Sequence, residues 1–121
     1  DGLWVDGRGV LWIQTDMSTS AMGKGDLAKL GNNAMLAADP RTGEIRRFLV
    51  GPAGCEITGA TGTPDGRTMF INIQHPVESP SERSDPEQPR RFSNWPDNRP
   101  DGRPRSATVV IRKLDGGVIG T

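Results

Sequence analysis

Short apolar runs separated by turn residues recur along the whole chain, and they predict β-strands. The expected strands are residues 3–6, 10–16, 34–39, 44–50, 57–63, 67–74, 107–112 and 117–119. Apolar and polar residues alternate in part of these runs, which is typical of a strand with one buried face. The stretches 10–14 and 69–73 are also nearly continuous in apolar residues, which indicates strands buried on both faces. The pattern therefore predicts an all-β chain.

Short turns join neighbouring runs into hairpins. Asp6-Gly7, Asp65-Gly66 and Asp115-Gly116 offer the positive φ that tight hairpins require. Residues 39–43 form a longer hairpin loop, in which Pro40 sets φ at the start. Four strands, a connection and four more strands in the same order make two tandem units. Such a repeat predicts two four-stranded antiparallel β-propeller blades, one over residues 1–53 and one over residues 54–121.

Each unit contains one long connection, between its second and third strands. Residues 17–33 are rich in Ser, Met, Gly and Lys, and a short helix is expected near 26–30. Residues 76–105 hold seven of the ten prolines and are expected to be an irregular insertion in the second blade. Because strands alternate in direction, both loops should emerge on the same face as Asp1 and Glu56. Long loops in compact domains are often functional, so this shared face is the predicted place for a site.

Composition adds constraints on size and partners. The 121 residues include 16 glycines and 10 prolines, which agrees with a turn-rich β-protein. A closed propeller needs about four blades, so two blades are expected to belong to a longer protein or to assemble from several copies. Association is expected through open apolar faces, because exposed patches of that size drive self-association. Residues expected on these faces are Trp12, Leu36, Phe70 and Val110.

Charge and hydropathy exclude two classes of partner. Fifteen basic and fifteen acidic side chains give a formal net charge of zero, so no overall field attracts nucleic acid or an anionic membrane. No apolar run approaches the ~20 residues that span a bilayer. The single Cys55 is interpreted as a small buried residue at a strand start rather than a metal ligand or catalytic thiol.

The start of the chain offers a first resemblance. Asp1-Gly2-Leu3, with a tryptophan-containing strand after Gly9, resembles the first-strand signature of regucalcin and gluconolactonase propellers. The resemblance implies that the aspartate points into the central channel and binds a divalent metal. An Asp-Gly pair is equally an ordinary turn, and both interpretations stay open on these residues alone.

A second resemblance involves motifs spread over nearly the whole chain. The motifs are Leu11-Trp12-Ile13-Gln14-Thr15-Asp16, Gly31-Asn32-Asn33, Cys55-Glu56-Ile57-Thr58-Gly59, Pro64-Asp65-Gly66-Arg67-Thr68-Met69-Phe70, Asn72-Ile73-Gln74-His75-Pro76, Ser93-Asn94-Trp95-Pro96 and Arg103-Pro104-Arg105-Ser106-Ala107. In this order they resemble the carboxyl-terminal part of the PhoX-type bacterial alkaline phosphatases. The resemblance implies a six-bladed propeller, export by the twin-arginine route to the periplasm or medium, and hydrolysis of phosphomonoesters with calcium and iron in the central channel.

The same resemblance assigns candidate site residues. Glu56 is the strongest candidate metal ligand, because it precedes the first strand of its unit, where a carboxylate reaches the channel. Asp1 takes the corresponding place in the first unit. Further candidates for the lining of the site are Asp16, Asn32, Asn33 and His75, and candidates for binding phosphate are Arg103 and Arg105. For His75 the ordinary alternative is a structural histidine beside Pro76.

Three hypotheses for function follow. The first is a segment of a metal-dependent phosphatase of PhoX type, the second is a lactonase-like propeller hydrolase, and the third is a non-catalytic propeller that binds a protein through its long loops. A metal cluster in a channel draws ligands from several blades, and two are expected here. The chain alone is therefore predicted to have little or no phosphatase activity.

Overall fold

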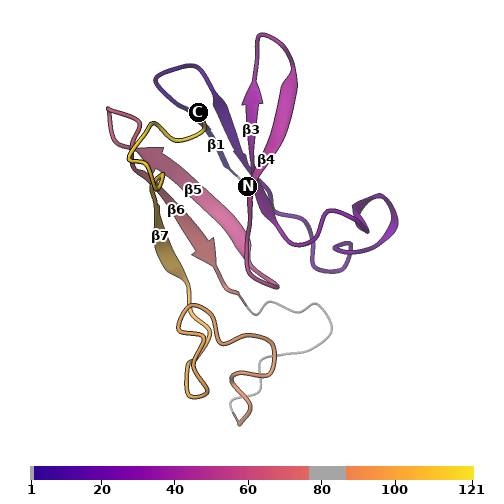
Figure 1. Cartoon of the computed structure of the whole chain (residues 1–121). Helices are drawn as coiled ribbons and strands as arrows, with labels where there is room; N and C mark the ends of the chain where they lie inside the picture. Colours follow the sequence, from indigo (N-terminus) through magenta and orange to yellow (C-terminus); the bar gives the residue numbers. More distant parts are fainter. Residues whose placement is uncertain (1, 77–86) are drawn as a thin grey trace.

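A computed structural model describes residues 2–76 and 87–121 and shows an all-β architecture of two antiparallel sheets (Figure 1). The first sheet has the order β1 (Gly2–Val5), β2 (Leu11–Gln14), β3 (Ala34–Asp39) and β4 (Glu44–Val50). The second has the order β5 (Glu56–Gly62), β6 (Met69–Gln74) and β7 (Ala107–Ile111). The predicted fold class is confirmed. Asp1 lies outside the described residues.

The second sheet has three strands in the described part of the chain, so the fourth strand expected over 117–119 is not formed. Instead, the Ile119 amide donates to the Gly66 carbonyl at 3.0 Å, and the Ile119 carbonyl accepts a bond from Arg8 at 2.7 Å. The segment thus crosses the hairpin tips of both sheets. Two apolar residues flanked by glycines are too few for a strand ladder, and Ile119, which is only 3% exposed, packs into the core instead.

The core lies between the two sheets. The first sheet contributes Trp12 and Met35 and the second contributes Ile57 and Ile71, all of which are at most 2% exposed. Burial of such side chains is the main stabilising force of a small domain. Phe48 adds an edge-on contact to the Trp12 ring, with centroids 4.9 Å apart.

The expected open apolar faces are only partly as predicted. Val110 is 54% exposed, while Leu36 and Phe70 are half-buried. Trp12 was expected on an open face and is fully buried. The reason is its register, because Trp12 pairs with Trp4 on the face that meets the second sheet, whereas its neighbour Ile13 points to the other face.

The sheets approach each other along their innermost strands, β1 and β5. A methyl group added at Gly62 of β5 would lie only 2.8 Å from the ring of Trp4 in β1, too close for a side chain to be accommodated without a shift. Glycine therefore permits the close approach. Figure 1 shows the two sheets diverging from this contact toward β4 and β7, as wedges of a ring do.

The two ends of the sheets differ. Figure 1 shows the hairpin turns and the carboxyl terminus at one end, which we call the hairpin end. Connections 15–33 and 87–106 and the start of β5 lie at the other, which we call the loop end. The predicted common face is thereby confirmed for Glu56 and for the described parts of both long loops, while residues 77–86 of the expected insertion lie outside the described residues. The helix expected near 26–30 is a single 3-10 turn, η1 (Gly25–Leu27).

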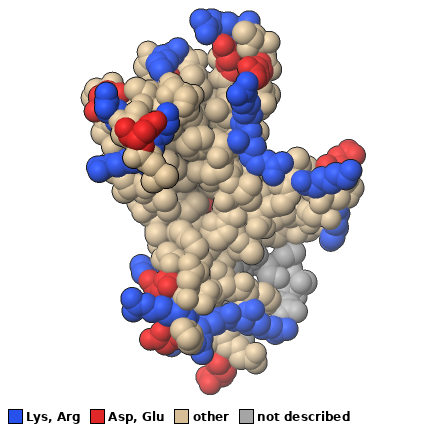
Figure 2. All heavy atoms as spheres, in the orientation of Figure 1, with Lys and Arg blue, Asp and Glu red and all other residues tan. Residues whose placement is uncertain are grey.

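Charged side chains are distributed over both ends. Figure 2 shows Lys and Arg beside Asp and Glu at the hairpin tips and again over connection 87–106, with a mostly uncharged middle. Ion pairs such as Arg41 with Asp39 and Arg105 with Asp97 account for part of this mixture. Among the described residues, no helix is long and apolar enough to cross a membrane.

Candidate functional site at the loop end

Glu56 and His75, two residues singled out from the sequence, meet at the loop end. Glu56 is the first residue of β5 and pairs with Gln74, the last residue of β6. His75 follows directly, and its Nε2 lies 3.2 Å from Glu56 Oε1. The side chains are 17% exposed for Glu56 and 33% exposed for His75, so solvent reaches the pair. A carboxylate beside an imidazole holds the ring in one orientation and offers both oxygen and nitrogen donors.

The backbone of His75 is held from the neighbouring strand. Its φ is +31°, a conformation that residues other than glycine rarely adopt. The His75 amide donates to Ser106 Oγ at 3.1 Å, and Ser106 directly precedes β7. Strained backbone of this kind persists where surrounding contacts enforce it, and it is found preferentially at functional sites.

A shallow depression of about 560 Å³ lies next to this pair, on the face of the second sheet that points away from the first. Its polar walls come from alternate residues of the strands, opposite the buried isoleucines of the core. The lining residues are Thr58, Asn72, Ile73, Gln74, Ser106, Ala107 and Thr108. Thr108 donates to Asn72 Oδ1 at 2.7 Å. The depression therefore offers hydroxyl and amide groups to a polar ligand.

The described residues do not by themselves assemble a metal centre. Within residues 2–76 and 87–121, no group of three His, Cys, Asp or Glu side chains has a suitable arrangement. A calcium ion takes six to eight oxygen ligands, of which Glu56 would provide one or two. A complete metal centre would need ligands from beyond the described residues.

Asn33 supports the segment that leads into Glu56. It is 1% exposed, and its Oδ1 accepts bonds from Thr15 Oγ1 at 2.9 Å and from the Met17 amide at 2.5 Å. Its Nδ2 donates to the carbonyl of Cys55 at 2.9 Å. The side chain thus connects the first sheet to the residue just before Glu56. Sequence reasoning placed Asn33 among residues lining the site and missed this positioning contact, which only the three-dimensional arrangement reveals.

Other sequence candidates lie farther from the depression. Asp16 is exposed and Asn32 is half-buried, in connection 15–33 of the first sheet. Arg103 and Arg105 are both exposed, and Arg105 forms an ion pair with Asp97 at 2.6 Å. Neither arginine is among the described residues that line the depression.

Cys55 is 1% exposed at the start of the second sheet, as expected from the sequence. Burial raises the pKa of its thiol to about 11, and the neighbouring Glu56 carboxylate adds to the effect. A thiol with this pKa is protonated at neutral pH and is a poor nucleophile or metal ligand.

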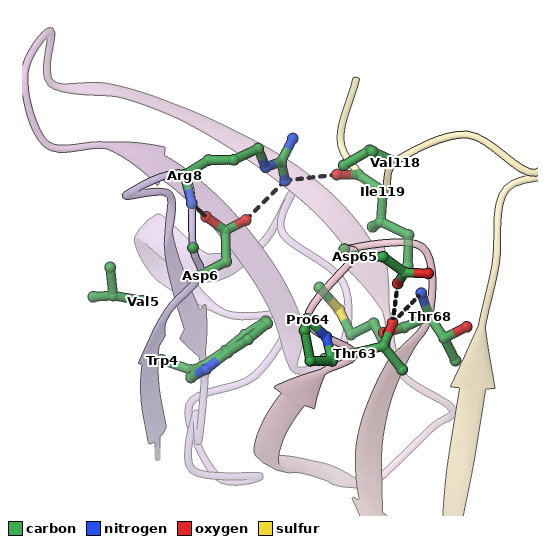
Figure 3. Close-up of a pocket in the computed structure, with 14 residues that line it drawn as sticks. Trp4, Val5, Asp6, Arg8, Thr63, Pro64, Asp65, Thr68, Val118 and Ile119 are labelled. Carbon is green, nitrogen blue, oxygen red and sulfur yellow. Dashed lines mark hydrogen bonds and ion pairs between the residues drawn. The ribbon is translucent and has the colours of Figure 1, made fainter.

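A second cavity, of about 400 Å³, lies between the sheets at the hairpin end (Figure 3). Asp6 lines it, and each of its carboxylate oxygens accepts two bonds. Oδ1 accepts from the amides of Arg8 and Val10 at 2.9 and 3.1 Å, and Oδ2 accepts from Arg8 Nη2 and Trp12 Nε1 at 2.7 and 3.2 Å. Arg8 extends onward to the Ile119 carbonyl.

These contacts make Asp6 a structural group rather than a reactive one. Burial alone would raise the pKa of this carboxyl, but the bonds from Arg8, Trp12 and Val10 outweigh it and hold the pKa below its usual value. We call Asp6, Arg8 and the Ile119 carbonyl the hairpin-end clasp. It joins the first sheet to the carboxyl-terminal segment.

Comparisons with known proteins add an independent line of evidence. The family model of the alkaline phosphatase PhoX matches residues 1–77. A solved structure described as Pseudomonas fluorescens PhoX in complex with vanadate, a transition state analogue, is 48% identical in sequence, with a TM-score of 0.82. That match covers 99% of this chain and 18% of the solved chain, so this chain spans less than a fifth of its length. A comparison with curated protein sequences finds no match.

Proposed function

Because the chain belongs to the PhoX family of alkaline phosphatases, we propose that it forms two blades of a phosphomonoester hydrolase. The observation that supports this most directly is the 48% identity to a PhoX structure over 99% of the chain. The agreement thus extends over both sheets, not over an isolated motif. It also favours this function over a lactonase-like hydrolase, whose resemblance was limited to the first residues. The vanadate bound to the solved relative is a transition state analogue, and phosphate esters are accordingly the proposed substrates.

We propose calcium and iron as the metals of this enzyme and Glu56 as one of their ligands. The resemblance to the family implies metal dependence, and Glu56 is a carboxylate at the loop end with His75 beside it. Carboxylate oxygens are the ligands that hard cations prefer. Asp1, which occupies the corresponding place in the first repeat, is proposed as a second ligand. The remaining ligands would come from other parts of a longer protein.

The chain's own residues are proposed to shape and orient this site. His75 fixes the Glu56 carboxylate through the 3.2 Å contact, and Asn33 fixes the backbone before it through the Cys55 carbonyl. Ligand groups held in this way lose less conformational entropy when they bind an ion or a substrate.

Several side chains at the loop end are proposed to interact with substrate. Asp16 and Asn32 are proposed as polar lining of the site. Arg103 and Arg105 are proposed to bind phosphate through charge-assisted hydrogen bonds, which are stronger than neutral ones.

Residues 1–121 alone are proposed to have little or no phosphatase activity, because the described part does not contain a full ligand set. The isolated chain is proposed to associate with itself through its open sheet faces, where Leu3 is 71% and Ile45 is 59% exposed. A periplasmic or secreted location is proposed from the family resemblance.

A chimera tests the proposed function. Residues 1–121 would replace the matching stretch of the Pseudomonas fluorescens protein, and hydrolysis of p-nitrophenyl phosphate and bound metal would be measured. We expect an active, metal-containing chimera in which Glu56→Gln lowers kcat/KM at least about tenfold and lowers bound metal, as loss of metal-site contacts does.

Glu44→Gln is the matched control, because Glu44 also begins a strand but is exposed and paired with Arg46. It should leave kcat/KM and metal content within about twofold of the unmodified chimera. A folded chimera without activity would contradict the proposed function. Full metal content and activity in the Glu56→Gln chimera would contradict the proposed ligand.

A further inference from the structure

Two rows of polar residues cross the second sheet at the loop end, and the depression beside Glu56 lies over them. The rows begin at Glu56 and Thr58 of β5, two positions apart. Since alternate residues of a strand share a face, both rows lie on the face that points away from the first sheet. The first row is Glu56, Gln74 and Ser106, and the second row is Thr58, Asn72 and Thr108.

The side chains that line the depression are uncharged. Its walls are formed by hydroxyl groups and side-chain amides, with Ile73 and Ala107 as the apolar members. Among the described lining residues there is no Lys, Arg, Asp or Glu and no aromatic ring. Charged residues are common on surfaces that only face solvent. The walls therefore suit a neutral group that both donates and accepts hydrogen bonds, rather than an ionic group or a flat aromatic one.

Most of the polar groups keep hydrogen-bonding capacity for a ligand. Within the described residues, the side chains of Thr58 and Gln74 make no hydrogen bond. Thr108 Oγ1 donates to Asn72 Oδ1 at 2.7 Å, which fixes the orientation of this amide and leaves its Nδ2 as a donor. A Cβ at Gly59 would come within 3.2 Å of Asn72 Nδ2, so the glycine keeps this donor accessible. An alcohol hydroxyl both donates and accepts and complements all of these groups.

The depression begins next to the proposed metal ligand. Gln74 lies directly opposite Glu56 in the strand ladder, which places their Cα atoms about 4.5 to 5.5 Å apart. Thr58 is two residues beyond Glu56 on the same face, about 6.5 Å along the strand. A phosphate ester whose phosphorus lies beside Glu56 can therefore extend its alcohol portion over the depression.

We propose that the depression is a subsite for the polyhydroxylated alcohol portion of a phosphate monoester, so that phosphates of sugars and related polyols are the preferred substrates. The hydroxyl groups of the alcohol exchange hydrogen bonds with Thr58, Asn72 and Gln74. A site of this kind disfavours an analogue without hydroxyls, because its polar groups then lose water without gaining a partner. The inference rests on the proposed phosphatase function and deepens it by naming the substrate class.

The test uses the chimera described above and two substrates that differ in their hydroxyl groups. Myo-inositol monophosphate and cyclohexyl phosphate both carry the phosphate on a six-carbon ring, and only the inositol ring has further hydroxyls. The measured quantity is the ratio of the two kcat/KM values. We expect the unmodified chimera to prefer the inositol ester at least about tenfold, which is the effect of about two neutral hydrogen bonds.

Matched variants locate the preference in the depression. Thr58→Val and Asn72→Leu each replace a polar side chain by an apolar one of similar size, and each should reduce the preference at least about fivefold. Thr61→Val is the control, because Thr61 is exposed on the same face of β5 but pairs with Phe70, outside the depression. It should leave the preference within about twofold of the unmodified chimera. Circular dichroism and metal content verify that each variant is folded and loaded.

Hydrolysis of p-nitrophenyl phosphate separates this inference from the proposed function. A chimera that does not hydrolyse it contradicts the function, and the inference falls with it. A chimera that hydrolyses it but has equal kcat/KM for the two ring esters overturns the inference alone. A preference that Thr58→Val and Asn72→Leu leave unchanged, or that Thr61→Val reduces equally, overturns it as well, because the hydroxyls are then recognised elsewhere. Either variant of the depression is sufficient where the other does not fold.

Discussion

Replacing Asp6 by alanine removes the acceptor on which the hairpin-end clasp depends. Four donors lose their partner: the amides of Arg8 and Val10, the Arg8 guanidinium and the Trp12 indole. The Asp6 side chain is only 10% exposed and Trp12 is fully buried, so water cannot easily replace the lost acceptor. The free energy of unfolding should therefore fall.

The size of the effect depends on which donors stay buried. A buried donor without an acceptor costs about 1 to 3 kcal/mol. Two donors, Trp12 Nε1 and the Val10 amide, are the most sheltered, whereas the Arg8 side chain is 37% exposed and can turn to water. We expect Asp6→Ala to lose about 2 to 5 kcal/mol, a large part of the roughly 5 to 15 kcal/mol of a typical domain.

Urea unfolding followed by tryptophan fluorescence measures this loss, and Asp39→Ala is the matched control. Asp39 also sits in a hairpin turn and pairs with an arginine two residues later, but Arg41 is 88% exposed. Exposed ion pairs contribute little to the free energy of unfolding, so Asp39→Ala should have a free energy of unfolding close to that of wild type. Equal losses in the two variants would refute the argument from burial.

The same contacts predict that the stabilisation contributed by Asp6 depends on pH. The bonds that Asp6 accepts hold its pKa below the usual value in the folded chain, so its carboxyl binds protons more readily when unfolded. Its stabilisation is complete above the unfolded pKa of about 4 and is lost as the pH falls through the lower folded pKa. The difference in the free energy of unfolding between wild type and Asp6→Ala should therefore become smaller as the pH falls below about 4. A difference that stays constant down to about pH 2 would contradict this assignment.

Two further predictions concern the segment before Glu56. Gly51→Ala should lower the free energy of unfolding in urea by about 1 to 3 kcal/mol, because the added methyl would overlap Cys55 Sγ and lie 3.1 Å from Ile57 in a packed core. Gly7→Ala is the control, because a methyl there meets nothing within 4 Å, and its free energy of unfolding should stay near that of wild type. Cys55, with a pKa of about 11 and 1% exposure, should not react with a thiol reagent at pH 8 in the folded chain and should react at once in urea; rapid reaction without denaturant would show that it is accessible.

Much of the fold follows from local sequence rules. The strands over 34–39 and 44–50 have the predicted bounds, because the turn over 39–43, with Pro40 and Gly43, separates two runs that carry apolar side chains. The strand predicted over 117–119 is not formed. A tight turn followed by two apolar residues resembles a strand locally, but the burial of Ile119 between the sheets decides the structure of this segment. The prediction that Trp12 lies on an open face was wrong for a related reason. When both faces of a strand carry apolar residues, the sequence does not reveal which face meets the second sheet.

Part of the candidate site could be predicted from the sequence, and part could not. Glu56 begins one strand and His75 directly follows the strand that pairs with it, so their proximity follows from the predicted hairpin. The support from Asn33 does not, because it joins residues 22 positions apart through a carbonyl of irregular backbone. Contacts of this kind leave no periodic signal in a sequence.

The stabilising clasp and the proposed site lie at opposite ends of the same inner strands. At the hairpin end the Asp6 carboxylate accepts four bonds and has no capacity left for a ligand. At the loop end Glu56 sits at the start of the equivalent strand of the next repeat, with a solvent-accessible contact to His75 and a polar depression beside it. The clasp holds the hairpin end closed, whereas the loop end carries the carboxylate that is proposed as a metal ligand. Loss of the clasp should consequently reduce stability before it alters the geometry around Glu56.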